Sequence, residues 1–272
     1  MNGEFYSKHF DLERVGDGVF AAIAKEGGGA VGNAGFVDLG GLTIVFDTFN
    51  TPQAAEDLKR AAERETARPV TWVVNSHFHG DHIRGNQVFK GSTIISSQIT
   101  FEKMRDIHPA RIEQQKRGIT ELTQYIQTLI EQLDRNHDHE LANKISFLSE
   151  VEASLPSLEL TLPQQTFEDE KVFIGTKRSA KLFTLGGGHS YCDAMLLIPE
   201  EKVLFLGDLL FVQTSPTYFE ESNPQQWMEI LEIVENLDFT IAVPGHGPVG
   251  TKNDVWSMKT MHGDGSRVSI ER

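Results

Sequence analysis

The sequence predicts an α/β fold in which β-sheets are covered by helices, and three observations support this prediction. Short apolar runs rich in β-branched residues, such as residues 70–74, are typical of buried strands. These runs alternate with helix-like segments, which is the pattern of sheets packed against helices. With 272 residues, 39% of them hydrophobic, the chain is long enough to bury a full core. No linker or repeat divides it, so we expect one domain over residues 1–272.

The first part of the chain is predicted to form strands and one helix. Glycines at 27–29 and at 40–41 separate the strands, as tight connections require. Thr51 and Pro52 mark the start of a helix, because proline favours the first helical turn. The predicted elements are strands at 19–25, 34–38, 42–47, 70–75 and 92–96, and a helix from 51 to about 64.

A polar, helix-rich segment at about residues 98–155 interrupts the strands. Its apolar residues are spaced by three and four positions, which indicates one amphipathic helical face. We expect a helical insertion whose apolar face covers the sheet; a lid or an oligomer contact is the alternative. The residues of this face are Ile119, Leu122, Tyr125, Ile126, Leu129, Ile130 and Leu133.

Strands resume after the insertion, and a helix precedes the last of them. The tail from Lys252 is polar and short, so we expect part of it to lack ordered structure. The predicted elements are strands at 171–175, 180–185, 194–198, 203–206 and 239–243, and a helix at about 224–236.

The most informative segment is Val73 to Asn86, with the sequence VVNSHFHGDHIRGN. A buried strand ends here, and three histidines and an aspartate follow within six residues: His77, His79, Asp81 and His82. Imidazole nitrogens and carboxylate oxygens are ligands that suit zinc. A polar loop with hydrogen-bonded histidines is the alternative, but such crowding of histidines beside a carboxylate favours a metal site.

Three more metal-type residues follow the same pattern. His189, Asp208 and His246 each lie just beyond a predicted apolar strand and beside a glycine. Because strand ends can meet at one edge of a sheet, these residues can converge with the first cluster despite their separation in sequence.

The motifs HFHGDH, GGGHS, GD and PGHG, in this order, resemble those of the metallo-β-lactamase-fold superfamily of metal-dependent hydrolases. The resemblance extends over nearly the whole chain. It implies an αβ/βα four-layer sandwich, in which two packed mixed β-sheets are flanked by helices and the metals lie at one edge.

The resemblance also implies a ligand set for two metal ions. One ion would be held by His77, His79 and His189, the other by Asp81, His82 and His246, and Asp208 would bridge both. Two Zn²⁺ per chain are expected, with Mn²⁺ or Fe as alternatives, sharing a hydroxide that acts as the nucleophile.

Other residues are assigned roles around these ligands. Asp81 is the expected catalytic residue, which orients the nucleophile and accepts its proton. Asn75, Ser76 and Ser190 are candidates to contact the second ring nitrogen of a ligand histidine.

The predicted function is a binuclear metal-dependent hydrolase of a small-molecule ester, thioester, lactone or amide. Asp208 resembles the glyoxalase II-like and lactonase-like branches, because the best-known zinc β-lactamases carry cysteine or serine there. Phe211 replaces both the lysine of the cysteine-type β-lactamases and the tyrosine of lactonases. β-Lactam cleavage is thus an alternative, expected to be incidental.

Two further alternatives come from other classes. Relatives with a single iron oxidise persulfides and lack a full second site, and a non-catalytic binding protein would have lost ligands. The complete ligand set of this chain disfavours both.

Composition limits the partners. The net charge of −14 argues against nucleic acid, and no apolar run is long enough to cross a bilayer. The N-terminus lacks the features of a secretory signal, and Cys192 is the only cysteine, so we expect a cytoplasmic protein without an intrachain disulfide. The expected partner is a small-molecule substrate. We expect no binding to a membrane, and a homo-oligomer is an open alternative.

Several other features are assigned less weight. Gly27, Gly29 and Gly32 match a dinucleotide-binding pattern, but a strand and not a helix follows, so we expect no nucleotide there and consider a flexible substrate flap instead. Tyr191, Tyr218 and Lys177 are candidates for the pocket wall, with plain surface exposure as the alternative. Cys192 is expected to be a buried structural residue. The histidines without an expected metal role are His9, His108, His137, His139 and His262.

Overall fold

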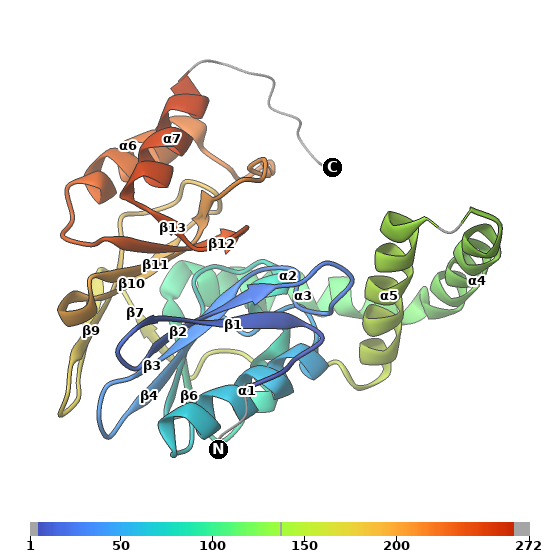
Figure 1. The fold of residues 1–272 in the computed structure, drawn as a ribbon, viewed down its shortest axis with the longest axis horizontal. Coiled ribbons are helices and arrows are strands. Elements are labelled where there is room, and N and C mark those ends of the chain that lie inside the picture. Colours follow the sequence, from blue (N-terminus) through green and yellow to red (C-terminus); the bar gives the residue numbers. More distant parts are fainter. Residues whose placement is uncertain (1–4, 137, 264–272) are drawn as a thin grey trace.

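The computed structural model describes residues 5–136 and 138–263, and these residues form two mixed β-sheets packed face to face (Figure 1). The first sheet contains both antiparallel pairs and the parallel pairs β4–β5, β5–β6 and β6–β7. In spatial order, its strands are β1 (Phe10–Gly16), β2 (Val19–Ala24), β3 (Ala34–Asp38), β4 (Thr43–Phe46), β5 (Trp72–Val74), β6 (Thr93–Ser97) and β7 (Gln165–Phe167).

The second sheet is built from the C-terminal half of the chain. Its pairs are antiparallel except for β11–β12, which is parallel. In spatial order, its strands are β13 (Gly250–Thr251), β12 (Ile241–His246), β11 (Val203–Phe211), β10 (Ala194–Ile198), β9 (Ser179–Thr184) and β8 (Glu170–Ile174).

Helices cover the outer face of each sheet. Helix α1 (Pro52–Thr66) lies against the first sheet, and α6 (Pro224–Glu235) and α7 (Lys252–Gly263) lie against the second (Figure 1). The expected four-layer αβ/βα sandwich is therefore confirmed. Short helices occur at α2 (Gly80–Ile83), η1 (Arg84–Phe89), η2 (Leu155–Ser157) and η3 (Pro199–Glu201).

Apolar side chains from both sheets meet in the central layer. Val37, Ile44 and Val74 of the first sheet are fully buried in the same cluster as Leu182 and Val203 of the second. Strands β3, β4 and β11 are buried at every position, which explains why they appear as continuous apolar runs and not as alternating patterns.

The start of α1 follows from its sequence. The Thr51 hydroxyl accepts a hydrogen bond from the backbone N–H of Ala54 at 3.3 Å, and Pro52 occupies the first turn, where its missing N–H costs nothing. Five alanine and leucine side chains of this helix then pack on the first sheet: Ala54, Ala55, Leu58, Ala61 and Ala62.

The insertion consists of α3 (Gln98–Arg117), α4 (Ile119–Asn136) and α5 (His139–Ser154). The expectation that its amphipathic face covers the sheet is wrong for α4, which packs on α5 and projects with it beyond the sheets (Figure 1). Helix α5 contacts the glycine-rich loop instead, since the Ser146 hydroxyl donates to the carbonyl of Gly27 at 2.7 Å.

The structure contains elements that the sequence patterns did not predict. Strands β1, β7 and β13 are short, polar or exposed, and the first part of the polar tail forms α7. The expectation that part of this tail lacks order concerns residues 264–272, which lie outside the described residues. Val255 and Met258 of α7 are buried against the second sheet, which gives this polar helix its anchor. None of the helices in the described part of the chain is long and apolar enough to span a bilayer.

Substitution of Phe205 tests the packing of the central layer between the two sheets. Its ring is 1% exposed and lies 5.5 Å from that of Phe46, so Phe205→Ala leaves a cavity between the sheets. We expect the free energy of unfolding to fall by about 3–5 kcal/mol, measured by urea denaturation of the purified protein. Ile174→Ala, at a position 77% exposed, is the control and is expected to change it by less than about 0.5 kcal/mol. A similar effect of both substitutions would contradict this packing.

Candidate metal centre

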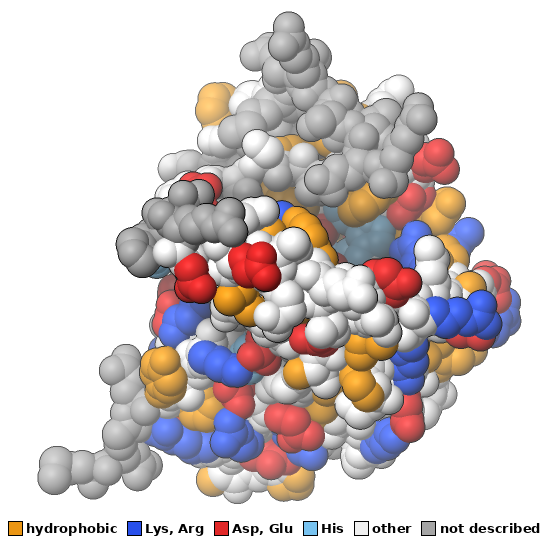
Figure 2. All heavy atoms as spheres, turned by 90° about the vertical axis from the view of Figure 1, so that its right-hand side faces the viewer, with side chains coloured by type: hydrophobic (Ala, Val, Ile, Leu, Met, Phe, Trp, Pro, Cys, Tyr) orange, Lys and Arg blue, Asp and Glu red, His pale blue; other side chains and the backbone are white. Residues whose placement is uncertain are grey.

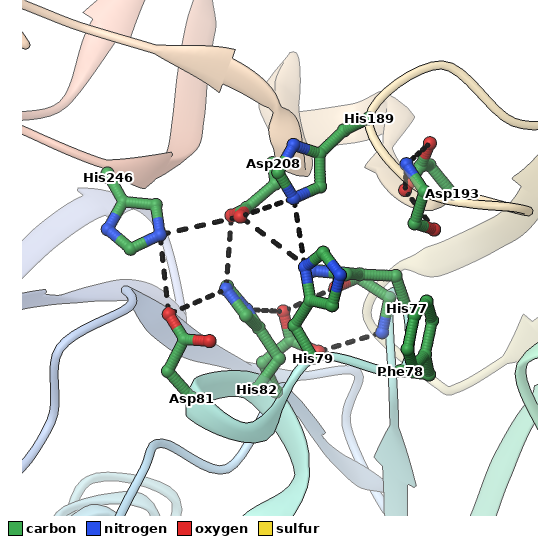
Figure 3. Close-up of polar contacts among 12 residues, drawn as sticks. His77, Phe78, His79, Asp81, His82, His189, Asp193, Asp208 and His246 are labelled. Atoms are coloured by element: carbon green, nitrogen blue, oxygen red, sulfur yellow. Dashed lines mark hydrogen bonds and ion pairs between the residues drawn. The ribbon is translucent and has the colours of Figure 1, made fainter. Parts of the chain in front are cut away.

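The seven predicted ligands converge at one edge of the sandwich, where loops and strand ends of both sheets meet (Figure 3). The first sheet supplies His77 and His79 from the loop after β5, and Asp81 and His82 from α2. The second sheet supplies the other three: His189 from the β9–β10 loop, Asp208 from β11 and His246 from the end of β12.

Four of these side chains form a buried group. Nδ1 of His79 lies 3.0 Å from Nε2 of His189, which lies 3.1 Å from Oδ2 of Asp208. Nε2 of His77 lies 3.7 Å from the same carboxylate oxygen. The four ligand atoms all lie within 4.8 Å of one another.

The other three residues form a second group, and Asp208 contacts both groups. Oδ2 of Asp81 lies 3.5 Å from Nε2 of His82 and 3.4 Å from Nε2 of His246. Asp208 approaches the same two nitrogens, at 3.0 Å through Oδ1 and at 3.4 Å through Oδ2. Its carboxylate therefore lies between the two groups, where a bridging ligand would lie.

Buried ligand atoms without hydrogen bonds show that these residues suit a metal. Nε2 of His77 is buried and has no hydrogen-bond partner among the described residues, and the 3.0 Å contact between Nε2 of His82 and Oδ1 of Asp208 lacks hydrogen-bond geometry. Native proteins rarely leave such atoms unsatisfied, because desolvating them without a partner is costly. Nitrogen and carboxylate donors are those of zinc sites, so the donor set fits divalent metal ions.

The opposite nitrogen of three of the histidines has a polar partner. Nδ1 of His77 contacts the Ser76 hydroxyl at 2.9 Å, as the sequence predicted for Ser76. Nε2–H of His79 donates to Glu221 at 3.0 Å, and Nδ1–H of His82 donates to Asp47 at 2.8 Å. Such contacts hold each ring so that its other nitrogen faces the site.

Asp47 is a functional residue that the sequence interpretation missed. Its carboxylate accepts bonds from His82, from the Ser76 hydroxyl and from the Ser76 backbone N–H, and it is fully buried. It thus positions His82 directly and His77 through Ser76. Its φ of 62° is unusual for a residue other than glycine. Asp47 follows an apolar strand directly, as the ligands do, and this signal could have identified it.

The other two candidates for outer contacts lie elsewhere. Asn75 donates to the carbonyl of His82 and to the Asn86 side chain. Ser190 donates to Asp193 and not to a histidine ring. Asp193, which sequence reasoning also missed, accepts bonds from the backbone of Gly188 and Ser190 and so shapes the loop that carries His189 (Figure 3).

A backbone irregularity brings Asp208 into the site. The predicted strand ended at residue 206, but β11 continues to Phe211 with register shifts on both sides of Gly207, whose φ is +54°. Asp208 therefore lies inside the strand and not beyond it. Shifts of this kind reorient a side chain next to an active site.

Burial and charge set the protonation of the metal-free cluster. Burial lowers the pKa of His77 well below its usual value, and the charge of His82 lowers it further. Burial would also lower the pKa values of His82 and His246, but the nearby carboxylates outweigh it. They raise the pKa of His82 well above its usual value and that of His246 to about 10.

A cavity of about 660 Å³ opens over the two groups, and Figure 2 shows histidine at the floor of this hollow, beside basic and hydrophobic side chains. It is lined by Val31, Asn50, His79, Gly80, Asp81, Arg84, Arg111, Phe147, Asp208, Thr217, Phe219, Glu220, Glu221 and His246. Tyr191, Tyr218 and Lys177, for which the sequence left the pocket wall and plain surface exposure open, are not among its lining residues.

The glycine-rich loop borders the cavity through Val31. Gly28 and Gly29 are themselves buried, and a Cβ there would come within 2.8 Å of His9 and 2.4 Å of Thr51. These glycines permit close packing, so the structure does not support a flexible flap at their positions.

The remaining histidines are separate from the ligand groups. His9 accepts a bond from the backbone of Gly29, and His108 donates to the carbonyl of Phe78 at 2.6 Å, behind the histidine loop. His139 is exposed, as expected, and Cys192 is buried and free. His137 and the side chain of His262 lie outside the described residues.

Comparison with known proteins agrees with this fold. Residues 27–246 match the model of the metallo-beta-lactamase superfamily, and the chain belongs to this family. A metallo-β-lactamase from Pontibacter korlensis is 15% identical, with a TM-score of 0.66 over 94% of this chain and 100% of that one. The DIM-1 metallo-β-lactamase is 16% identical, with a TM-score of 0.64 over 95% and 99%. A metallo-β-lactamase from Hirschia baltica is 15% identical, with a TM-score of 0.64 over 94% and 98%. At these identities the likeness concerns the fold.

Substitution of Gly245 tests whether zinc binding depends on the position of the Asp208 carboxylate. A Cβ on Gly245 would lie 1.9 Å from Oδ1 of Asp208, so Gly245→Ala must displace the carboxylate that both groups share. We expect at least about a tenfold loss of zinc affinity, measured by competition with a chromophoric chelator. Gly91→Ala, where a Cβ meets nothing within 4 Å, is the control. Unchanged affinity in Gly245→Ala would contradict the role of Asp208.

The raised histidine pKa values predict proton release on metal binding. At pH 8 His82 and His246 are protonated in the metal-free protein, whereas a metal ligand must be a neutral imidazole. Full loading with Zn²⁺ is expected to release about two protons per chain, counted by calorimetry in buffers of different ionisation enthalpy.

A pair of variants assigns these protons. His246→Asn is expected to release about one proton fewer, and the exposed His139→Gln is expected to match the unmodified chain. Loading without proton release would contradict the protonated cluster.

Proposed function

We propose that this chain is a binuclear metal-dependent hydrolase of a small-molecule ester, thioester, lactone or amide. The observation that carries the proposal is the pair of ligand groups that share Asp208 and contain buried donor atoms without hydrogen bonds. His77, His79 and His189 would hold one ion, Asp81, His82 and His246 the other, and Asp208 both. When bound, two such ions supply Lewis acidity and make water a nucleophile at neutral pH.

The chain's own residues support hydrolysis in three ways. The cavity volume of about 660 Å³ suits a small-molecule substrate. Asp81 lines this cavity, and burial would raise its pKa, but the charges of His82 and His246 hold it well below the usual range. Asp81 is therefore an ionised carboxylate placed to hold a proton during the reaction. Phe219 packs on the His79 ring at 4.5 Å and gives the substrate an apolar wall.

The complete second group distinguishes this proposal from a single-iron oxidative enzyme. Asp81, His82 and His246 are all present and converge within 4.8 Å. Because the similar solved structures are β-lactamases, a β-lactam belongs in the substrate panel, although Phe211 occupies the position where the cysteine-type enzymes have lysine.

Metal content and hydrolysis together test the proposal. We expect about two equivalents of zinc, manganese or iron per chain by plasma mass spectrometry of protein purified without added metal. We also expect chelator-sensitive hydrolysis of at least one thioester, lactone, amide or ester in a panel. A single tightly held iron, or the absence of hydrolysis at full metal occupancy, would overturn the proposal.

A matched pair of aspartate variants tests the role of Asp81. Asp81→Asn keeps the shape but removes the charge, so we expect kcat to fall about 10²–10⁴-fold. Asp106→Asn, at an exposed position on α3, is expected to leave kcat unchanged.

A further inference from the structure

Two arginines line the cavity beside the ligand groups. Arg84 lies in η1, directly after α2, and Arg111 lies on α3 of the helical insertion. The wall that contains them is therefore formed jointly by the main body and the insertion.

Arg84 is held in place by neutral groups. Its Nη1 donates to the Asn50 side-chain oxygen at 3.1 Å, and its Nη2 donates to that of Gln115 at 2.9 Å. Its Nε is buried without a hydrogen-bond partner among the described residues. Gly80 permits this arrangement, since a Cβ there would lie 2.8 Å from Nε. The guanidinium is fixed, but nothing in these contacts neutralises its charge.

Neither arginine pairs with a carboxylate, and in this they differ from the other arginines whose side chains are described. Within the described residues, no carboxylate oxygen lies within 4.0 Å of either guanidinium. Every other arginine whose side chain is described has such a partner: Arg14, Arg60, Arg64, Arg68, Arg105, Arg117 and Arg178. In a chain with 39 acidic and 25 basic residues, two unpaired arginines in one cavity are unexpected.

The two charges also act on each other. Both guanidinium groups line the cavity that also contains Asp81, so their like charges repel each other. Asp81 is itself engaged by His82 and His246. An anion between the guanidinium groups would relieve this repulsion.

The other carboxylates of the cavity come from elements other than those of the arginines, and Asp208 of β11 is engaged by the ligand histidines. Glu220 and Glu221 follow Phe219 in the loop between β11 and α6, and Glu221 is engaged by His79. The cavity is therefore lined by an acidic segment and, on other elements, by the two arginines.

We propose that Arg84 and Arg111 form a subsite that binds an anionic oxygen group, a carboxylate or a phosphate, carried by the substrate. The identity of this ligand as a substrate rests on the proposed hydrolase function. Guanidinium groups bind such oxyanions through paired hydrogen bonds, which gives both affinity and orientation. Val31, Phe147 and Phe219 supply apolar surface for the carbon chain of the substrate.

Matched substrates test the subsite in the metal-loaded protein. A glutaryl thioester of N-acetylcysteamine ends in a carboxylate, whereas its glutaramoyl analogue ends in a neutral amide of nearly equal size. We expect kcat/KM to favour the carboxylate by about ten- to a hundredfold. In Arg111→Gln this preference should fall by about tenfold or more, through a higher KM for the carboxylate substrate.

Arg117→Gln is the matched control, because Arg117 lies on the same helix and pairs with Glu113 at the surface. It is expected to keep the full preference for the carboxylate. Arg84→Gln should lose it as Arg111→Gln does; since Arg84 is partly buried, the exposed Arg111 provides the decisive variant.

Ligand-induced stabilisation of the metal-free protein separates the subsite from catalysis. Glutarate or inorganic phosphate at equal concentration is expected to raise Tm in the unmodified chain and in Arg117→Gln, but not in Arg111→Gln, whereas glutaramide should have no effect. The more effective anion identifies the carboxylate or the phosphate as the natural group.

The two proposals fail in different ways. Equal hydrolysis of both thioesters, with no Tm shift that depends on Arg111, overturns the subsite and leaves the hydrolase standing. Anion stabilisation that depends on Arg111, without hydrolysis of any substrate at full metal occupancy, keeps the subsite and overturns the hydrolase.

Discussion

The buried carboxylate of Asp208 is the feature on which the rest of the site depends. Burial would raise its pKa, but the charges of His82 and His246 hold it well below the usual range, so it is an anion at the junction of both sheets. An anion in such a place must be surrounded by cations or metal ions. This requirement accounts for the histidines from both sheets, for the bulge at Gly207 and for the absence of a side chain at Gly245.

A second carboxylate supports this arrangement from behind. Asp47 accepts from His82 directly and from His77 through the Ser76 hydroxyl, so one side chain orients a histidine of each ligand group. On the opposite side, Asp193 fixes the loop of His189 through its backbone. The ligands are thereby rigid, which is what a site needs if its geometry is to exist before substrate arrives.

The candidate metal ligands and part of the cavity wall come from different parts of the chain. The two sheets, with α2 and the loops at one edge, supply every candidate ligand, while α3 and α5 of the insertion contribute Arg111 and Phe147 to the cavity. In such an arrangement a change in the insertion alters which molecule is bound without touching the ligands. This separation is consistent with the many reactions that one fold can host.

The sequence by itself predicted every strand except β1, β7 and β13, the first helix, and the seven residues that converge at the candidate metal centre. Their signals are local, because a buried strand is a continuous apolar run and a ligand cluster follows its end. Only the tertiary structure decided the roles of Asp47, Glu221 and the two arginines, since each depends on neighbours distant in the chain. It also decided where α4 packs and that the polar tail forms α7, because an amphipathic face does not specify which surface will bury it.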